Sequence, residues 1–306
     1  MNAQDRSFLS DFDWSRLGSL RLRASAVADG LYVGSHRSAR RGAGVEFGGH
    51  RTYVRGDDLR WLDRHALMRH GRLLVREFET ETDRVLRLLL DATASMGYAG
   101  PKSPVTKLEY AVLLAAVVAR VALATGDRVA VDWFGGKATR WLPAIGGRDS
   151  FDRVVGVLEA VQAAEDLATD ISALERALVP VSRYARRGAI VVLFSDLIDL
   201  PDAALDRIAT LSAGGRTLVV VQILDRAEEE FPFRGAVQLH SLEGGRSVET
   251  DGALARPQYL EAFRQRNQQM QDFFAHRGIP LIRTSSMNDP ISSVRLLIGS
   301  LDRARW

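Results

Sequence analysis

The 306-residue chain contains no cysteine, which excludes disulfide bonds and thiolate metal sites. Lysine is also scarce, because Lys102, Lys107 and Lys137 are the only three. The start of the sequence lacks the apolar core of a signal peptide. The longest apolar run near the middle covers residues 111–119, whereas a helix that crosses a bilayer takes about 20 residues. We therefore expect a cytoplasmic protein with no membrane span.

Several catalytic and metal-binding motifs are missing as well. The six histidines show no zinc spacing, and no Gly-x-Ser-x-Gly elbow of a serine hydrolase is present. The stretch "GYAGPKS" differs from a phosphate-binding loop because Pro101 separates the glycine from the lysine and removes an amide donor. These absences argue against zinc hydrolases, serine hydrolases and nucleotide binding.

The net charge is only +3, but the positive charge is unevenly placed. Residues 31–76 hold ten arginines against four acidic residues. Such a segment could contact nucleic acid, an acidic protein or acids of its own domain. No aromatic-interleaved binding motif accompanies it, so we attribute the arginines mainly to genome composition and do not favour nucleic acid as the partner.

From Arg84 onward, apolar β-rich runs alternate with segments of helical period. This alternation predicts an α/β domain, with a mostly parallel sheet and helices on both faces. We expect residues 1–80 to form an Arg-rich extension and residues 81–306 to form the α/β domain, with an inserted β-hairpin at about 231–251. Strands are predicted at 84–91, 127–135, 138–145, 189–196, 217–225 and 279–286, and helices at 107–125, 148–164, 170–185, 201–215, 256–278 and the C-terminal residues.

The segment "DATAS" follows the first predicted strand and carries three oxygen ligands, Asp91, Thr93 and Ser95. Two further oxygens are suitably placed: Thr169 precedes a predicted helix, and Asp196 ends a predicted buried strand. Sites in parallel α/β sheets lie at the carboxyl ends of the strands. Carboxylates and hydroxyls suit Mg²⁺, so we predict a magnesium site, with Mn²⁺ or Ca²⁺ as alternative ions.

The spacing Asp-x-Thr-x-Ser, followed by a loop threonine and a strand-end aspartate, resembles the metal-ion-dependent adhesion site of von Willebrand factor A domains. The upstream stretch 42–81 resembles the signature of the family called domain of unknown function 58, or DUF58, although Arg64 stands where that family usually has tryptophan. The matching signature residues are Glu46, Phe47, Arg51, Tyr53, Gly56, Asp57, Asp58, Arg60, Asp63, Arg76, Glu77 and Phe78.

The DUF58 resemblance implies a bacterial von Willebrand A-like domain that acts with a MoxR-type AAA+ ATPase. We expect a non-enzymatic interaction module that helps to assemble or mature another complex. In the related adhesion sites, a protein partner donates a carboxylate to the metal.

Other interpretations remain open. Thr93 and Ser95 could instead cap backbone groups in a turn, Thr169 could cap a helix, and Asp196 could be a solvated strand end. The alternative functions are a metal-dependent phosphohydrolase and an Arg-rich nucleic-acid binder. A haloacid-dehalogenase-type phosphatase would have a second aspartate two residues after Asp91, where this chain has Thr93.

Overall fold

The computed structural model describes residues 19–32, 46–53, 68, 73–79, 84–136, 141–164, 171–198, 200–240 and 247–303. The chain divides into two compact units. The smaller unit, within residues 35–83, contains an antiparallel pair formed by β1 (Glu46–Thr52) and β2 (Leu74–Glu79). The strands carry part of the upstream signature, and Phe47 is the register partner of Phe78. Signature residues 56–63 and Arg64 lie outside the described ranges.

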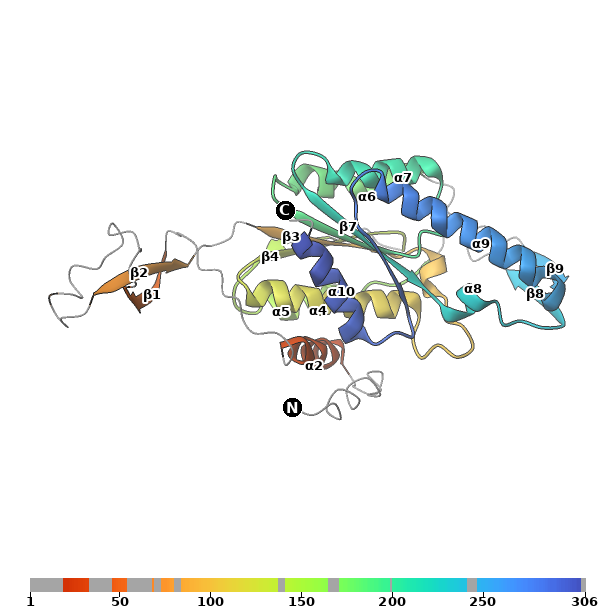
Figure 1. The fold of residues 1–306 in the computed structure, drawn as a ribbon, viewed down its shortest axis with the longest axis horizontal. Coiled ribbons are helices and arrows are strands. Elements are labelled where there is room, and N and C mark those ends of the chain that lie inside the picture. Colours follow the sequence, from red (N-terminus) through yellow and green to blue (C-terminus); the bar gives the residue numbers. More distant parts are fainter. Residues whose placement is uncertain are drawn as a thin grey trace. The chain divides into compact units, whose positions relative to one another are not determined.

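The larger unit is built on a six-stranded sheet with the strand order β10-β7-β6-β3-β4-β5 (Figure 1). Five strands run parallel, and β5 pairs antiparallel with β4 at one edge. The central strands are almost completely buried, which is why they appear in the sequence as nearly continuous apolar runs. The predicted α/β architecture is confirmed. The strands are β3 (Val85–Asp91), β4 (Arg128–Phe134), β5 (Leu142–Ile145), β6 (Ile190–Ser195), β7 (Thr217–Leu224) and β10 (Leu281–Ser285).

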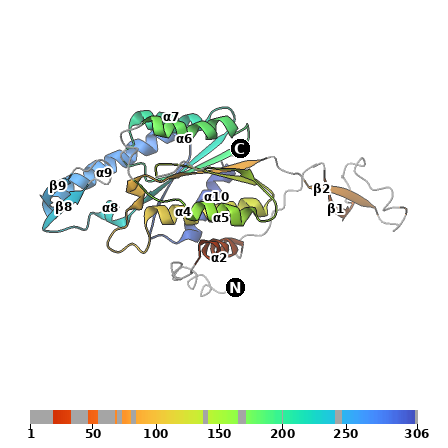
Figure 2. The same cartoon turned by 180° about the vertical axis from the view of Figure 1, so that it is seen from behind.

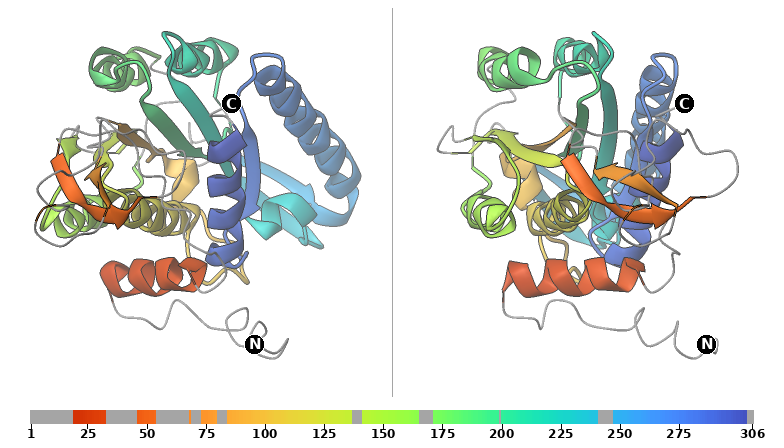
Figure 3. Two further views of the ribbon diagram at one scale, coloured as in Figure 1. Left: turned by 60° about the vertical axis from the view of Figure 1, so that its left-hand side comes forward. Right: turned by 90° about the vertical axis from the view of Figure 1, so that its left-hand side faces the viewer.

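Helices cover both faces of this sheet (Figures 2 and 3). One apolar core lies between the sheet and α4 (Lys107–Ala124), α5 (Ser150–Glu159) and α10 (Pro290–Arg303). The other lies between the sheet and α6 (Ile171–Tyr184), α7 (Asp202–Ala209) and the C-terminal part of α9 (Gly252–Ala275). Within the described ranges, none of these helices has the length and apolar character needed to cross a membrane.

Helix α2 (Leu20–Tyr32) belongs to the larger unit, although we expected residues 1–80 to form one separate extension. Its buried side chains recur at helical spacing and join the core of α4 and α10. The division at residue 80 therefore needs correction for this helix. The buried residues are Leu20, Ala24, Val27, Ala28 and Leu31.

The predicted hairpin is present as the antiparallel strands β8 (Ala236–His240) and β9 (Ser247–Asp251). Its two ends meet, because the amide of Gly252 donates to the carbonyl of Gly235 at 2.8 Å. Helix α9 begins at Gly252, before the predicted start at 256, because the Asp251 side chain accepts hydrogen bonds from the amides of Ala253 and Leu254.

A buried ion pair lies inside the sheet on the α6 side. Arg87 of β3 donates from Nη1 to Oδ2 of Asp132 on β4 at 3.3 Å, and both side chains are 2% exposed. Burial lowers the pKa of Arg87, and burial raises the pKa of Asp132 to about 6 against the opposing effect of Arg87. The remaining atoms Arg87 Nε and Asp132 Oδ1 have no hydrogen-bond partner within the described structure. This pair is therefore incompletely satisfied.

Candidate metal site

Four of the five predicted site residues lie at or just after the ends of β3 and β6, where the strand order reverses. The chain passes from β3 to β4 on one side and returns through β6 on the other, so the carboxyl ends of β3 and β6 flank a topological switch point. Ligands of parallel α/β folds bind at such points. Asp91 ends β3, and Ser195 and Asp196 follow one another at the end of β6.

The "DATAS" segment folds back on its own aspartate. Thr93 donates to Asp91 Oδ1 twice, from its amide at 3.0 Å and from its hydroxyl at 2.7 Å. Ser95 Oγ lies 3.1 Å from Thr93 Oγ1. Ser95 belongs to the short 3₁₀ turn η3 (Ala94–Gly97), which follows Thr93 directly. Three of the five predicted ligands therefore form one continuous oxygen cluster, and all three are buried.

Ser195 joins this cluster from β6. Its hydroxyl donates to Asp91 Oδ2 at 2.6 Å and accepts the amide of Leu197 at 3.0 Å. Leu197 has a φ of 58°, a backbone conformation that costs a residue with a Cβ about 1–2 kcal/mol. Strain of this kind concentrates at functional sites. Ser195 lies at the end of a predicted strand, but its contact with Asp91 was not predicted.

The neighbouring strand and loop approach the site closely through backbone groups. Gly135 follows β4 with a φ of 77°, and a Cβ at this position would lie 2.6 Å from the amide nitrogen of Thr93. Ala164 donates its amide to the carbonyl of Ala92 at 3.2 Å. Ala164 is the last described residue before 165–170, so Thr169, the fifth predicted ligand, lies outside the described residues.

Asp91 is buried and close enough to Asp196 for the two carboxylates to interact. Burial, and to a smaller extent the nearby charge of Asp196, raise the pKa of Asp91 to about 7. Within the described ranges, no three acidic or histidine side chains are placed so that they could hold a metal ion together, so a metal here would depend on hydroxyl ligands as well. Two carboxylates with several hydroxyls are a donor set that fits Mg²⁺. Asp91, Thr93, Ser95 and Asp196 are the described residues that could hold it.

Lys107 is a functional candidate that was not predicted from the sequence. It is the first residue of α4, and its side chain is 0% exposed. Its ammonium group donates to Asp196 Oδ2 at 2.7 Å and to Glu228 Oε1 at 2.5 Å. Lysine is rare in this Arg-rich chain, with three lysines among 41 basic residues, and this rarity was a signal in the sequence.

Asp225, at the end of β7, anchors the loop between the candidate site and α4. Its Oδ2 accepts hydrogen bonds from the Gly100 amide at 3.0 Å and from the Ser103 hydroxyl. Its Oδ1 caps α8 (Arg226–Glu230) by accepting the amide of Ala227. Burial alone would raise the pKa of Asp225, but these hydrogen bonds lower it below its usual value. Hydrogen bonds therefore connect the end of β7 with the loop that leads from the candidate site to α4.

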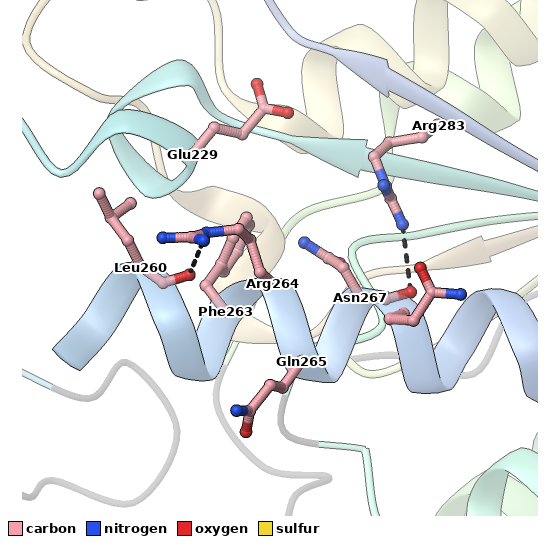
Figure 4. Close-up of a pocket in the computed structure, with 8 residues that line it drawn as sticks. Glu229, Leu260, Phe263, Arg264, Gln265, Asn267 and Arg283 are labelled. Atoms are coloured by element: carbon pink, nitrogen blue, oxygen red, sulfur yellow. Dashed lines mark hydrogen bonds between the residues drawn. The ribbon is translucent and has the colours of Figure 1, made fainter. Parts of the chain in front are cut away.

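An open groove of about 630 Å³ borders α8 on another side (Figure 4). Arg283 of β10 donates to Gln222 Oε1 and to the backbone oxygen of Asn267. Glu228 and Glu229 are adjacent on α8, and the first contacts Lys107 whereas the second lines the groove. Helix α8 thus contributes one residue to the contacts of Lys107 and the next residue to the wall of the groove. The groove is lined by Glu229, Leu260, Phe263, Arg264, Gln265, Asn267, Gln268 and Arg283.

This chain is similar to several known proteins. Uncharacterized proteins of Mycobacterium bovis and Mycobacterium tuberculosis are each 26% identical over 294 residues, which cover 94% of this chain and 89% of theirs. Similar solved structures include the conserved hypothetical protein BatB from Bacteroides thetaiotaomicron, with 16% identity, a TM-score of 0.41, and coverage of 72% of this chain and 98% of that one. A von Willebrand factor type A structure from Catenulispora acidiphila has 18% identity and a TM-score of 0.33, covering 50% of this chain and 35% of that chain.

The family assignment rests on a sequence-family model described as "Protein of unknown function DUF58", which matches residues 49–269. The matched residues begin within β1 and include β2 and the sheet strands β3, β4, β5, β6 and β7. It also contains every predicted metal ligand. Because the match covers more than half of the 306 residues, this chain belongs to the DUF58 family.

Proposed function

We propose that this DUF58 protein is a non-enzymatic interaction module whose partner binding depends on Mg²⁺. The ion would be held by Asp91, Thr93, Ser95 and Asp196, with Thr169 as a fifth ligand. The observation that carries the proposal is the oxygen cluster of Asp91, Thr93 and Ser95 beside the end of β6. Mn²⁺ and Ca²⁺ are alternative ions for the same oxygen ligands.

The ligand types suit a docking site. The hydroxyls of Thr93, Ser95 and Thr169 carry no formal charge, so a bound ion would keep electrophilic character and could accept another ligand. By the resemblance to adhesion sites, that ligand is a carboxylate of a protein partner. The resemblance to DUF58 proteins further suggests a MoxR-type AAA+ ATPase as the partner and the assembly or maturation of another complex as the role.

Calorimetric titration with Mg²⁺ and Mn²⁺ tests the metal site. The wild-type protein and Asp149→Asn should bind the ion alike, because Asp149 is exposed and belongs to the loop before α5. Asp91→Asn and Thr93→Val should bind it weakly or not at all, since each removes one proposed ligand. Equal binding by wild type and Asp91→Asn would show that the site is assigned to the wrong residues.

A pull-down of a MoxR-type ATPase, with and without a chelator, tests the partner. We expect retention that requires Mg²⁺ and is abolished by Asp91→Asn but not by Asp149→Asn. Retention that is insensitive to both chelator and Asp91→Asn would place the contact elsewhere on the protein. Turnover of a generic phosphate ester by the wild type, lost in Asp91→Asn, would support a phosphohydrolase instead.

A further inference from the structure

Lys107 occupies a position where a positive charge is unfavourable on two counts. It is buried at the first position of α4, and the N-terminus of a helix carries a partial positive charge. Burial would lower the pKa of Lys107, but Asp196 and Glu228 together raise it above its usual value. The ammonium group is therefore charged, and the two acids hold it in place.

The two acids differ in their relation to the candidate metal site. Asp196 is a proposed ligand, and its two oxygens accept hydrogen bonds from Lys107 at 2.7 Å and from the Ile198 amide at 3.0 Å. Glu228 lies on α8, and its other oxygen accepts the amide of Asp225 at 2.8 Å. Lys107 thus shares its charge between one residue of the site and one residue outside it.

We propose that Lys107 is an internal counter-ion that competes with a divalent cation for Asp196. Without metal, the ammonium group neutralises Asp196. When a divalent cation takes Asp196, Lys107 transfers its pairing to Glu228, which is already within hydrogen-bonding distance. The balance between Asp196 and Glu228 would therefore set the metal affinity. This inference rests on the proposed function, because it assigns a regulator to the same site.

Two substitutions should change metal affinity in opposite directions. Lys107→Met removes the competing charge and should tighten Mn²⁺ and Mg²⁺ binding by about tenfold or more. Glu228→Gln leaves Asp196 as the only acid of the pair, so Lys107 should hold it more strongly and metal binding should weaken by about threefold to tenfold. Calorimetry at fixed ionic strength measures both effects.

The chain offers a matched control for each variant. The control for Lys107→Met is Lys102→Met, which removes the same charge from an exposed lysine five positions earlier. The control for Glu228→Gln is Glu229→Gln, which removes the same charge from the neighbouring residue. Both controls should bind metal within about twofold of the wild type, because bulk charge is largely screened. The melting temperature gives a second readout. In the presence of a chelator, Lys107→Met leaves Asp196 buried without a counter-ion. Added Mg²⁺ should therefore raise the melting temperature of this variant more than that of the wild type.

The outcomes separate this inference from the proposed function. If the wild type binds metal and Lys107→Met binds it equally or more weakly, Lys107 is not a competitor and the inference fails alone. If only Lys107→Met binds metal, and Asp91→Asn abolishes that binding, the inference stands and the metal-dependent function of the wild type fails. Absence of binding by every variant overturns both. If Lys107→Met does not fold, Glu228→Gln decides, and unchanged or tighter binding there overturns the inference.

Discussion

Ser195 donates its hydroxyl proton to Oδ2 of Asp91 at 2.6 Å, and this bond joins the ends of β6 and β3. The same oxygen of Ser195 accepts the amide of Leu197, so one side chain supports both a buried carboxylate and a left-handed backbone residue. The order at the edge of the sheet therefore depends on a serine that is not among the proposed ligands.

Ser195→Ala should lower the free energy of unfolding by about 1–3 kcal/mol, because it removes a partner from each of two buried polar groups. Chemical denaturation with urea measures this change. Ser182→Ala, at an exposed serine near the end of α6, should shift the free energy of unfolding by less than about 0.5 kcal/mol. Equal effects of the two substitutions would contradict the role given to Ser195.

Gly135→Ala tests the close approach between the end of β4 and the "DATAS" loop. Gly147 has a similar φ of 85°, but a Cβ there would meet nothing within 4 Å, so Gly147→Ala measures backbone strain alone. We expect Gly147→Ala to cost about 1–2 kcal/mol, and Gly135→Ala to cost about 1–3 kcal/mol more because of the contact with Thr93. Thermal unfolding compares the two, and equal losses would mean that the loop moves aside freely.

The pH dependence of stability should carry a component from Asp132. Burial raises its pKa to about 6, whereas an aspartate in an unfolded chain has a pKa of about 3.9. The native state therefore binds more protons than the unfolded state between these pH values, and the free energy of unfolding falls as pH rises through them. A shift of this size corresponds to about 3 kcal/mol in total, of which about 2 kcal/mol is lost between pH 4 and pH 6.

Urea unfolding at several pH values should show this loss in the wild type, and Asp132→Asn should lack that part of it. Other buried acids contribute to both profiles, so the difference between the two proteins is the relevant quantity. Parallel profiles from pH 4 to pH 6 would show that Asp132 has an ordinary pKa in the folded protein.

Removing one partner of the Arg87–Asp132 pair should be worse than removing both. Arg87→Met leaves a buried carboxylate unpaired and should cost about 3–5 kcal/mol. The double variant Arg87→Met with Asp132→Leu replaces the pair with apolar side chains and should be nearly neutral or stabilising. Urea denaturation of the two single variants and the double variant provides the comparison. Additive losses would contradict this expectation.

The sequence predicted most of the sheet because strands such as β6 and β7 are buried on both faces and therefore uniformly apolar. It also predicted the Asp91–Thr93–Ser95 cluster, since alternate residues after a strand share a loop. It did not predict Lys107, because helical periodicity shows that a position is buried but not which strand end it faces. It did not predict α8 either, since five residues are too few to show a helical period.

The hydrogen bond between Gly252 and Gly235 closes the β8–β9 hairpin at its base. A segment whose two ends already meet can change length or sequence without altering the distance that the flanking chain must span. The hairpin is therefore a natural place to graft an epitope or a fluorescent reporter. Such a graft should leave the Asp91 loop and the order of the sheet intact, because the hairpin is not part of that sheet.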